Sequence, residues 1–600
     1  MKKITFIILD IVLISLAVWL AFILRFEGNI PAEYLEYGIL VKTIFLVSLF
    51  TICIFYVFEL YSFSWSYVST NELISLFEAV TLSFGFSIVS IFIIGMVKDL
   101  PRSILFISYF LIFIFTGAIR FAKRMYLQIY KKNTGKERTL IVGAGDVGEE
   151  ILRSILTANT CYLPIGFVDD DVSKQGIMIH GLKVLGTIHN IPKLIKENQI
   201  EQLIIALPSA GSETIKRAVV TARDAGLRKI KIVPSLAEII DSQAFIKQLR
   251  EIEIEDLLGR EEVVLDTRSI GDFISNKVVL ISGAAGSIGS ELSRQIIKFK
   301  PSKLLFLDQD ETGIFNISQE FKNLEAEFLV ADIRDKQRIE QIFRDFKPNI
   351  VFHAAAYKHV PLMEKQAYEA VKNNIFGTKI MAEFSLKYQI EKFVFISTDK
   401  AVNPSSIMGA TKRVGEMICQ SLNQKGLTKF ISVRFGNVLN SRGSVVPIFK
   451  EQIKKGGPVE ITHPEMKRYI MITSEAVLLV MQAAAIGNGG EVFVLNMGKP
   501  ISILSLAKEL IKLSGFEPDK DIPIVFTEPR PGEKFFEEIL TAEEGTIATE
   551  NKNIFIAKLS NINKDKLYYN LKDLEHISNE EEIKNILEKI VSSYNSFNKI

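Results

Sequence analysis

The stretch KVVLISGAAGSIG, residues 277–289, decides the fold of the larger part of this 600-residue chain. Its first six residues form an apolar run typical of a buried strand, and its glycines lead directly into a helical segment, residues 290–299. Glycines at this spacing let the backbone approach a pyrophosphate, whose charge suits the amino end of a helix. We therefore predict an α/β domain with a dinucleotide site that includes Gly283, Gly286, Ser287, Ile288 and Gly289.

The strands that follow supply the rest of the predicted cofactor site. Residues 303–307 lead to Asp308, which stands 19 residues after Gly289, where a carboxylate accepts hydrogen bonds from an adenosine ribose. An arginine does not follow at once, so NAD is favoured over NADP. The fourth strand ends in Ala354, Ala355 and Ala356. These small side chains either let the cofactor lie close or serve helix–sheet packing, and both interpretations stay open.

A second polar stretch follows the strand at residues 393–396. Ser397-Thr398-Asp399-Lys400 lies at the carboxyl end of that strand, where ligands bind in a parallel open sheet. Met408 and Lys412 are four residues apart, so a helix places them on one face, one turn from each other.

These features resemble the extended short-chain dehydrogenase/reductase superfamily, whose Tyr-x-x-x-Lys helix has Met408 in the tyrosine's place here. Asp399-Lys400 beside the missing phenol resembles one branch, the membrane-bound UDP-N-acetylglucosamine 4,6-dehydratases of bacterial glycan synthesis. The resemblance covers nearly all of the chain and is most specific from Lys277 onward. It implies C4 oxidation by NAD, loss of water across C5–C6 and hydride return to C6. The product would be UDP-2-acetamido-2,6-dideoxy-4-hexulose, for surface polysaccharide or protein glycosylation.

The resemblance also implies residue roles. Asp399 would be the acid toward the C6 oxygen, and Lys400 the base toward C5. Lys412 would contact the nicotinamide ribose, and Asp332-Ile333 the adenine. Both catalytic roles need proton affinities shifted toward neutrality, and for Lys400 we expect burial and a nearby cation such as Lys412 to lower the pKa.

Met408 leaves the C4 hydroxyl without its usual proton acceptor, because a thioether carries no ionisable group. Two hypotheses stay open. Asp399 takes this proton and later delivers it to C6, or Thr398 relays it to water.

The substrate half carries a set of polar residues that match the family's sugar-nucleotide contacts. Arginines suit the diphosphate because their planar fork donates two parallel hydrogen bonds. The family likeness assigns Asn374 to support of the catalytic helix and Glu533 to the uridine ribose. The predicted substrate residues are Lys358, His359, Glu364, Asn374, Asn437, Arg442, Ser444, Arg468, Arg530 and Glu533.

The first 125 residues hold four apolar runs of spanning length, near residues 4–24, 39–60, 74–97 and 104–121. Lys2 and Lys3 precede the first run, and a larger basic cluster follows the fourth, which puts both ends in the cytoplasm. Lys98 and Arg102, in the third connection, count against this orientation. We predict a multi-pass protein of the bacterial inner membrane with a cytoplasmic catalytic domain.

The expected organisation has four parts: a transmembrane four-helix region (1–132), a Rossmann-like domain (133–260), a linker (261–276) and an extended short-chain dehydrogenase/reductase domain with a smaller substrate lobe (277–600). The middle domain carries Gly143-x-Gly145-x-x-Gly148 and Asp169 after a second strand, a fair dinucleotide fingerprint. Nucleotide binding and a relic fold that serves as spacer or oligomer contact remain equal interpretations.

Composition narrows the function classes. The formal net charge of +2 argues against a nucleic-acid binder, and the scattered cysteines and histidines indicate neither a disulfide framework nor a metal site. The expected partners are a UDP-sugar, the lipid bilayer and further copies of this chain. Two rival hypotheses are a UDP-sugar 4-epimerase or reductase, which Met408 disfavours, and a membrane-anchored scaffold with vacant nucleotide folds. The tail after Ala542, amphipathic near residues 583–591, is either a peripheral helix or an oligomer contact.

Overall fold

The structure is a computed structural model. It describes residues 2–36, 38–58, 60–61, 70–95, 100–130, 136–158, 160–208, 210–233, 249–257, 266–322, 324–423, 427–538, 545–558 and 562–595. The chain divides into two compact units, a helical unit (Met1–Lys136) and an α/β unit (Glu137–Ile600).

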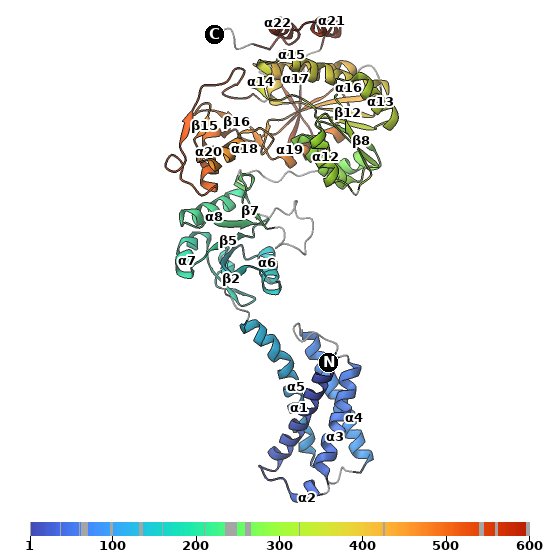
Figure 1. Ribbon diagram of the computed structural model, residues 1–600, viewed down its shortest axis with the longest axis vertical. Helices are drawn as coiled ribbons and strands as arrows, with labels where there is room; N and C mark the ends of the chain where they lie inside the picture. The colour runs from blue at the N-terminus through green and yellow to red at the C-terminus, as the bar shows by residue number, and fades with distance from the viewer. Residues whose placement is uncertain are drawn as a thin grey trace. The chain divides into compact units, whose positions relative to one another are not determined.

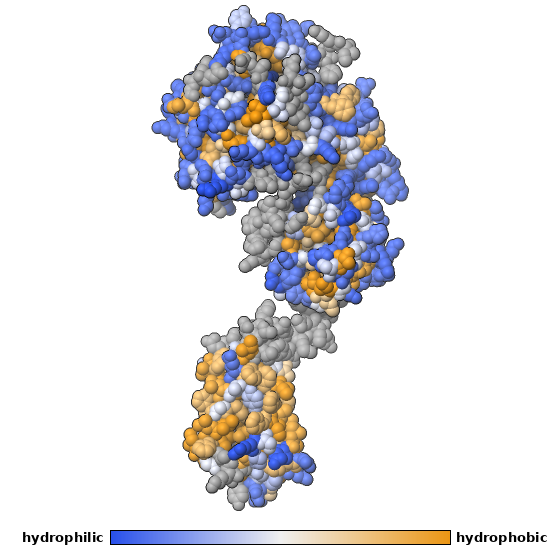
Figure 2. All heavy atoms as spheres, turned by 180° about the vertical axis from the view of Figure 1, so that it is seen from behind, coloured by the Kyte–Doolittle hydropathy of each residue, from blue (hydrophilic) through white to orange (hydrophobic). Residues whose placement is uncertain are grey.

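The helical unit contains the four predicted apolar spans. Its helices are α1 (Lys2–Arg25), the short α2 (Ala32–Glu36), α3 (Ile39–Val57), α4 (Thr70–Ile93) and α5 (Arg102–Tyr130). Four of them are long and apolar enough to cross a membrane: Phe6–Arg25, Ile39–Val57, Ile74–Ile93 and Arg102–Arg120. Figure 2 shows apolar residues spread over the outside of this unit, whereas the α/β unit is mostly polar there. An outer surface of this kind suits lipid rather than water.

A buried ion pair joins the first and last long helices of this unit. Both guanidinium ends of Arg120 donate to the Asp10 carboxylate, at 3.1 Å and 2.7 Å, and the Arg120 guanidinium carbon lies 5.1 Å from the Phe55 ring centroid. Asp10, an apparent interruption of the first span, is therefore neutralised inside the bundle. Arg120 belongs to this pair, so its charge does not count among the exposed basic residues after the fourth span.

The larger, C-terminal part of the α/β unit is built on a nine-stranded sheet of order β10-β9-β8-β11-β12-β13-β18-β22-β21. The first seven strands are parallel, and β22 pairs antiparallel with both of its neighbours. The chain order reverses between β8 and β11, and ligands bind at such a switch point. The strands are β8 (Val278–Ser282), β9 (Lys303–Asp308), β10 (Ala326–Val330), β11 (Ile350–His353), β12 (Lys392–Ile396), β13 (Lys429–Arg434), β18 (Val492–Leu495), β21 (Thr546–Ala548) and β22 (Ile554–Ala557).

Helices cover both faces of this sheet (Figure 1), so the predicted α/β fold is confirmed. One face carries α13 (Lys336–Phe346), α14 (Val360–Glu364), α15 (Ala367–Ala370), the π-helical segment η6 (Val371–Gly377), α16 (Thr378–Lys387) and α17 (Ile407–Asn423). The other carries α10 (Thr267–Ile274), α11 (Ser287–Ile296), α12 (Glu311–Glu320) and α19 (Thr473–Ile486). Helix α10 falls within the stretch predicted as a linker, and its Ile270 and Ile274 are fully buried in this second core.

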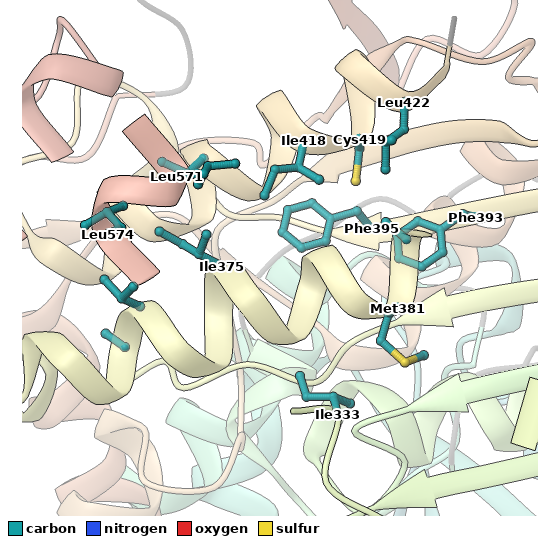
Figure 3. Packing of buried hydrophobic residues seen from close by; sticks show 14 of the residues in the cluster. Ile333, Ile375, Met381, Phe393, Phe395, Ile418, Cys419, Leu422, Leu571 and Leu574 are labelled. Atoms are coloured by element: carbon teal, nitrogen blue, oxygen red, sulfur yellow. The ribbon is translucent and has the colours of Figure 1, made fainter. Parts of the chain in front are cut away.

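The amphipathic tail forms a helical hairpin, α21 (Lys564–Glu575) and α22 (Glu580–Ile590). Its apolar side chains belong to the same core as α17, and Figure 3 shows Leu571 and Leu574 beside Ile418 and Ile375. The tail is thus part of a hydrophobic core of the α/β unit, which corrects the expectation of a peripheral helix, while the oligomer contact stays a prediction.

The substrate lobe packs around its own apolar cluster, which includes Phe449, Ile461 and Leu510. Its elements are β14 (Asn437–Val438), α18 (Val445–Lys454), β15 (Val459–Ile461), β16 (Lys467–Arg468), β17 (Ile470–Met471), β19 (Ile501–Ser502), α20 (Ile503–Leu513) and β20 (Ile524–Phe526). Three two-stranded pairings, β14–β17, β15–β20 and β16–β19, tie it together.

The middle part forms the predicted small α/β sheet, of order β3-β4-β2-β1-β5-β6-β7. Its strands are β1 (Glu137–Val142), β2 (Tyr162–Val168), β3 (Met178–Ile179), β4 (Leu182–Gly186), β5 (Gln202–Ile205), β6 (Lys229–Ile232) and β7 (Arg250–Glu251), with helices α6 (Asp146–Thr157), α7 (Ile191–Asn198) and α8 (Ser212–Asp224). Asp169 follows β2, accepts from the Ala144 backbone N–H at 2.8 Å and pairs with Lys174 at 3.1 Å. A short 3-10 helix, η4 (Ile254–Leu257), follows β7.

Candidate active site

The glycine turn after β8 forms one wall of a cavity of about 850 Å³. Gly283 has φ +70°, and a Cβ there would lie 2.6 Å from the Ala355 backbone nitrogen, so the turn requires glycine. A Cβ on Gly286 would meet only the Gly283 carbonyl oxygen, at 3.2 Å. The cavity is lined here by Gly283, Gly286, Ser287, Ile288, Gly289, Ala354 and Ala356. The amino end of α11 therefore opens onto a cradle that a side chain at Gly286 would narrow.

Asp308 stands beside this turn, at the end of β9. Its carboxylate accepts from the Ala285 backbone N–H and from the Asp310 backbone N–H, both at 3.0 Å. Asp169 of the middle part makes the same two kinds of bond, to Ala144 and Asp171. The two glycine turns are thus built alike. Of the other predicted cofactor residues, Asp332 pairs with Arg334 at 2.7 Å, and Ile333 and Ala355 lie outside the cavity lining.

The second polar stretch lies where the sequence predicts it, at the carboxyl end of β12. Thr398 and Lys400 line the cavity, whereas Asp399 is 1% exposed and lies behind them. The Asp399 Oδ1 atom accepts from the Thr398 hydroxyl at 2.8 Å and from the Lys400 amine at 3.0 Å. The same amine donates to Asn437 Oδ1 at 3.1 Å. The predicted acid, Asp399, and the predicted base, Lys400, are therefore hydrogen-bonded to each other, and Asp399 lies behind two neighbours that line the cavity.

The electrostatic surroundings of Lys400 differ from the sequence expectation. Burial alone would lower the pKa of Lys400, but the negative charges of Asp399 and Glu537 outweigh burial and raise it. The prediction of a lowered pKa for Lys400 is therefore wrong, because two carboxylates face this amine. Arg468 opposes them more weakly.

Helix α17 brings Met408 and Lys412 to the cavity wall, one turn apart. The Lys412 amine lies 4.0 Å from the centroid of the Phe395 ring. Burial lowers the pKa of Lys412 to about 7, with the Glu416 charge acting in the opposite direction. This side chain therefore changes charge near neutral pH when the cavity holds no ligand.

Buried polar contacts hold α17 against the sheet. The Arg434 guanidinium donates to both carboxylate oxygens of Glu416, at 2.7 Å and 2.8 Å, and the Ser397 hydroxyl donates to the same carboxylate at 2.6 Å. Glu364 accepts from the Ile407 backbone N–H at 2.6 Å at the start of the helix. Asn374 bonds both backbone groups of Tyr357 and donates to the Thr411 hydroxyl at 3.1 Å. Glu364 and Asn374, both predicted as substrate residues, lie outside the cavity lining and position the catalytic helix.

The remaining predicted substrate residues all line the same cavity. They come from the segment after β11, from β14 and the loop that follows it, from β16, and from the segment after β20. They are Lys358, His359, Asn437, Arg442, Ser444, Arg468, Arg530 and Glu533.

Comparison with known proteins identifies the family. A sequence model described as "Polysaccharide biosynthesis protein" matches residues 279–559, and one described as "CoA-binding domain" matches residues 39–234. The chain is 42% identical over 549 residues to the capsular polysaccharide biosynthesis protein CapD of Staphylococcus aureus, with 90% of each chain covered. The chain belongs to the polysaccharide biosynthesis protein family.

Two shorter relatives of this chain are named as nucleotide-sugar enzymes. The inverting UDP-N-acetylglucosamine 4,6-dehydratase of Campylobacter jejuni is 32% identical over 286 residues, and the UDP-glucose 4-epimerase of Rickettsia rickettsii is 32% identical over 290 residues. Each match covers 47% of this chain and 82% of the relative. The polysaccharide biosynthesis protein is thus an enzyme of the dehydratase and epimerase branch of the short-chain dehydrogenase/reductase superfamily. Identity alone does not separate the two reactions.

Glu537, a residue of the cavity wall, was not among the predicted site residues. Glu537 lines the cavity, and its Oε1 atom lies 3.5 Å from the Lys400 amine. It follows the Arg530-Pro-Gly-Glu533-Lys534 motif by only three residues, in the sequence Phe-Phe-Glu-Glu. The sequence contained a signal for Glu537: it lies close behind a motif that was itself predicted to contact the diphosphate, so the same segment brings both to the cavity.

Proposed function

We propose that this polysaccharide biosynthesis protein is an NAD-dependent 4,6-dehydratase that converts UDP-N-acetylglucosamine to UDP-2-acetamido-2,6-dideoxy-4-hexulose. The observation that carries the proposal is the Lys400 amine on the cavity wall, hydrogen-bonded to the Asp399 carboxylate, with the apolar Met408 at the place of a phenol. An elimination across C5–C6 needs one base and one acid, and this pair provides both. A simple C4 oxidation needs a base for the C4 hydroxyl proton, but it needs no group that acts on C5 or C6.

The residues divide the work as follows. Lys400, once neutral, accepts the C5 proton, exchanges it with solvent and delivers a proton to C5 after water has left. Asp399 supplies a proton to the departing C6 oxygen through Thr398, whose hydroxyl lies on the cavity wall and donates to Asp399 at 2.8 Å. Asn437 orients the lysine amine, to which its Oδ1 atom lies at 3.1 Å. Asp399 first takes up the proton that leaves the C4 hydroxyl, and it later gives up one proton to the water that forms from the C6 hydroxyl, so the proton count balances.

The cofactor assignment is supported by the cradle at the amino end of α11. The side-chain-free surface at Gly286 accommodates a pyrophosphate, and Asp308 at the end of β9 suits a ribose. NAD supplies a hydride acceptor and donor, so the dehydration proceeds without net oxidation. Lys412 would lie toward the nicotinamide ribose.

The diphosphate and sugar are assigned to the opposite wall. Arg442, Arg468 and Arg530 bring three guanidinium groups to the cavity, which suits two phosphates. Lys358 and His359 contribute further polar groups, and burial lowers the pKa of both. The acetamido group of the sugar rests on likeness to the dehydratase relative of Campylobacter jejuni.

A UDP-sugar 4-epimerase is the second candidate, favoured by the relative of that name with the same 32% identity. The experiment incubates the full-length protein in detergent with NAD and UDP-N-acetylglucosamine in deuterated water. A dehydratase yields a keto product that has lost water and carries deuterium at C5. A C4 epimer without loss of water would establish the epimerase, and absence of turnover would favour a binding protein. Lys400→Met should abolish the reaction, whereas Lys455→Met, which changes an exposed lysine directly after α18, should not.

The proposed location is the bacterial inner membrane, with the α/β unit in the cytoplasm. It is supported by four helices of spanning length and by the lysines that precede the first of them. Reporter fusions at the two chain ends test it: activity of a periplasm-specific reporter at either end would contradict this orientation.

A further inference from the structure

A second carboxylate reaches Lys400 from a distant part of the chain. Glu537 belongs to the segment of residues 530–538, which follows β20 of the substrate lobe. Its Oε1 atom lies 3.5 Å from the Lys400 amine and 3.8 Å from Arg468 Nε. Its side chain is only 4% exposed, so this carboxylate is part of the cavity wall rather than a surface charge.

The segment that carries Glu537 is fixed on both sides. The Lys534 amine donates to the Val402 carbonyl at 3.1 Å, and the Ser405 hydroxyl donates to the Gly532 carbonyl at 3.3 Å. Arg468 donates to the Phe535 carbonyl at 3.1 Å. The chain also turns at Gly532, with φ +79°, where a Cβ would lie 2.9 Å from Val360. Glu537 is therefore held in place by the loop after Lys400 and by β16.

The pairing of Glu537 is incomplete. Among the residues that the structure describes, neither Oε2 of Glu537 nor Oδ2 of Asp399 has a hydrogen-bond partner, and both atoms are buried. A carboxylate that served only to tie two segments together would be expected to use both oxygens, because a buried unpaired acceptor is costly. The unpaired oxygen instead indicates that the charge of this carboxylate, which acts on the Lys400 amine through Oε1, matters more here than a tie between segments.

On the basis of the proposed dehydratase function, we propose that Glu537 is a positioning residue. It holds the Lys400 amine at the cavity wall together with Asp399, and it sets the pH range in which this amine is free to accept a proton. This role goes beyond the Asp399-Lys400 pair, because it adds a residue of the substrate lobe that lies 137 positions further along the chain than Lys400.

The charges around Lys400 explain the expected effect. Burial of Lys400 favours its neutral amine. The negative charges of Asp399 and Glu537 favour its ammonium form, and the positive charge of Arg468 disfavours that form. Replacing Glu537 by glutamine keeps the shape and removes one negative charge. The ammonium form then loses stabilisation, so the neutral amine becomes available at lower pH.

The test measures kcat/KM for dehydration against pH in the full-length protein. The limb that rises with pH reports the loss of the Lys400 proton. In Glu537→Gln this limb should move toward acid by about 1–3 pH units, the size expected for loss of an opposite charge within hydrogen-bonding range. Glu537→Asp keeps the charge and should leave the limb near its wild-type position while lowering kcat.

The neighbouring glutamate provides the matched control. Glu538 is 49% exposed and contacts Asn403 and Lys534 at 2.7 Å and 3.8 Å rather than Lys400. Glu538→Gln should leave the pH profile unchanged. An unchanged profile in Glu537→Gln would overturn the proposal, and an equal shift in both variants would assign the effect to segment 530–538 as a whole and overturn it as well.

A second measurement does not depend on turnover. Competitive acetylation with acetic anhydride, followed by mass spectrometry of the peptide with Lys400, gives the pH at which this amine loses its proton. In Glu537→Gln this pH should fall, and in Glu538→Gln it should not. If the wild type fails to dehydrate the sugar but this shift is seen, the proposed function fails while the contact of Glu537 with Lys400 stands. If the shift is absent, the positioning role fails.

Discussion

Among single residues, Thr398 and Asp399 are the groups proposed to take the proton of the C4 hydroxyl, because Met408 offers no ionisable group. The structure places the Thr398 hydroxyl on the cavity wall and the Asp399 carboxylate directly behind it, 2.8 Å away. The two hypotheses from the sequence, a direct role for Asp399 and a relay through Thr398, therefore describe neighbouring atoms on one path. We propose that the carboxylate receives the proton through the hydroxyl.

The first prediction concerns Asp399→Asn. An amide cannot take up the C4 proton, so both the transient formation of NADH and the dehydration should fall by at least about 10²-fold. NADH fluorescence in a single turnover measures the first step, and the keto product measures the second. Normal NADH formation with loss of dehydration alone would show that another group takes the C4 proton. Glu538→Gln serves as the control with an intact site.

At the scale of elements, the catalytic helix is positioned by groups that never reach the cavity. Burial alone would raise the pKa of Glu416, but Arg434, Arg413 and the Ser397 hydroxyl lower it to about 2. This carboxylate joins α17 to β13 and to the residue before Thr398. The angle of the helix, and with it the place of Lys412, depends on this pairing.

The second prediction is therefore made for Glu416→Gln. It leaves the fully buried Arg434 without its carboxylate, which typically costs about 3–5 kcal/mol of folding free energy. Urea denaturation of the full chain measures the loss, and Glu451→Gln on the exposed face of α18 should leave stability unchanged. The folded pKa of Glu416 is depressed, so its contribution is present above the unfolded value, near 4.3, and is lost as pH falls toward 2. Equal acid sensitivity of wild type and variant would contradict this assignment.

The elements that the sequence predicts well are those with local signals. The strand-glycine-helix unit at residues 277–299 and the polar stretch after β12 lie where their spacing places them, since each pattern is confined to a few turns of chain. The site position of Glu537 and the core position of the tail hairpin were missed, because both depend on contacts between residues far apart in the sequence. The pairing of Glu537 with Lys400 and the packing of α22 on α17 are visible only once the chain has folded.

The third prediction concerns the tail hairpin. Leu571 is 1% exposed within the core that contains α17, so Leu571→Ala should destabilise the α/β unit by about 2–5 kcal/mol. Tyr569, two residues earlier on the same helix, is 68% exposed, and Tyr569→Ala should have little effect. Thermal unfolding of both variants tests this difference. Similar behaviour of the two would mean that the hairpin does not share the core of the catalytic part.

At the scale of the whole molecule, the chain combines two units with opposite surface chemistry. The helical unit exposes large apolar side chains such as Phe45, Phe92 and Phe106, whereas the α/β unit buries its apolar groups in separate cores. Each unit has its own cluster of buried residues, so each can be weakened separately. The Asp10–Arg120 pair lies wholly within the helical unit and provides the means to test this separation.

The fourth prediction is that Asp10→Asn weakens the helical unit and leaves the chemistry intact. Arg120 loses the carboxylate that neutralises it inside the bundle, and an uncompensated charge among apolar helices is unfavourable. The variant should aggregate at a lower temperature in detergent, while kcat at a temperature where it remains folded should match the wild type. Glu33→Gln, on the exposed face of α2, controls for the loss of one acidic group. A fall in kcat without a change in stability would contradict this prediction, because it would show that the structure of the helical unit affects catalysis in the α/β unit.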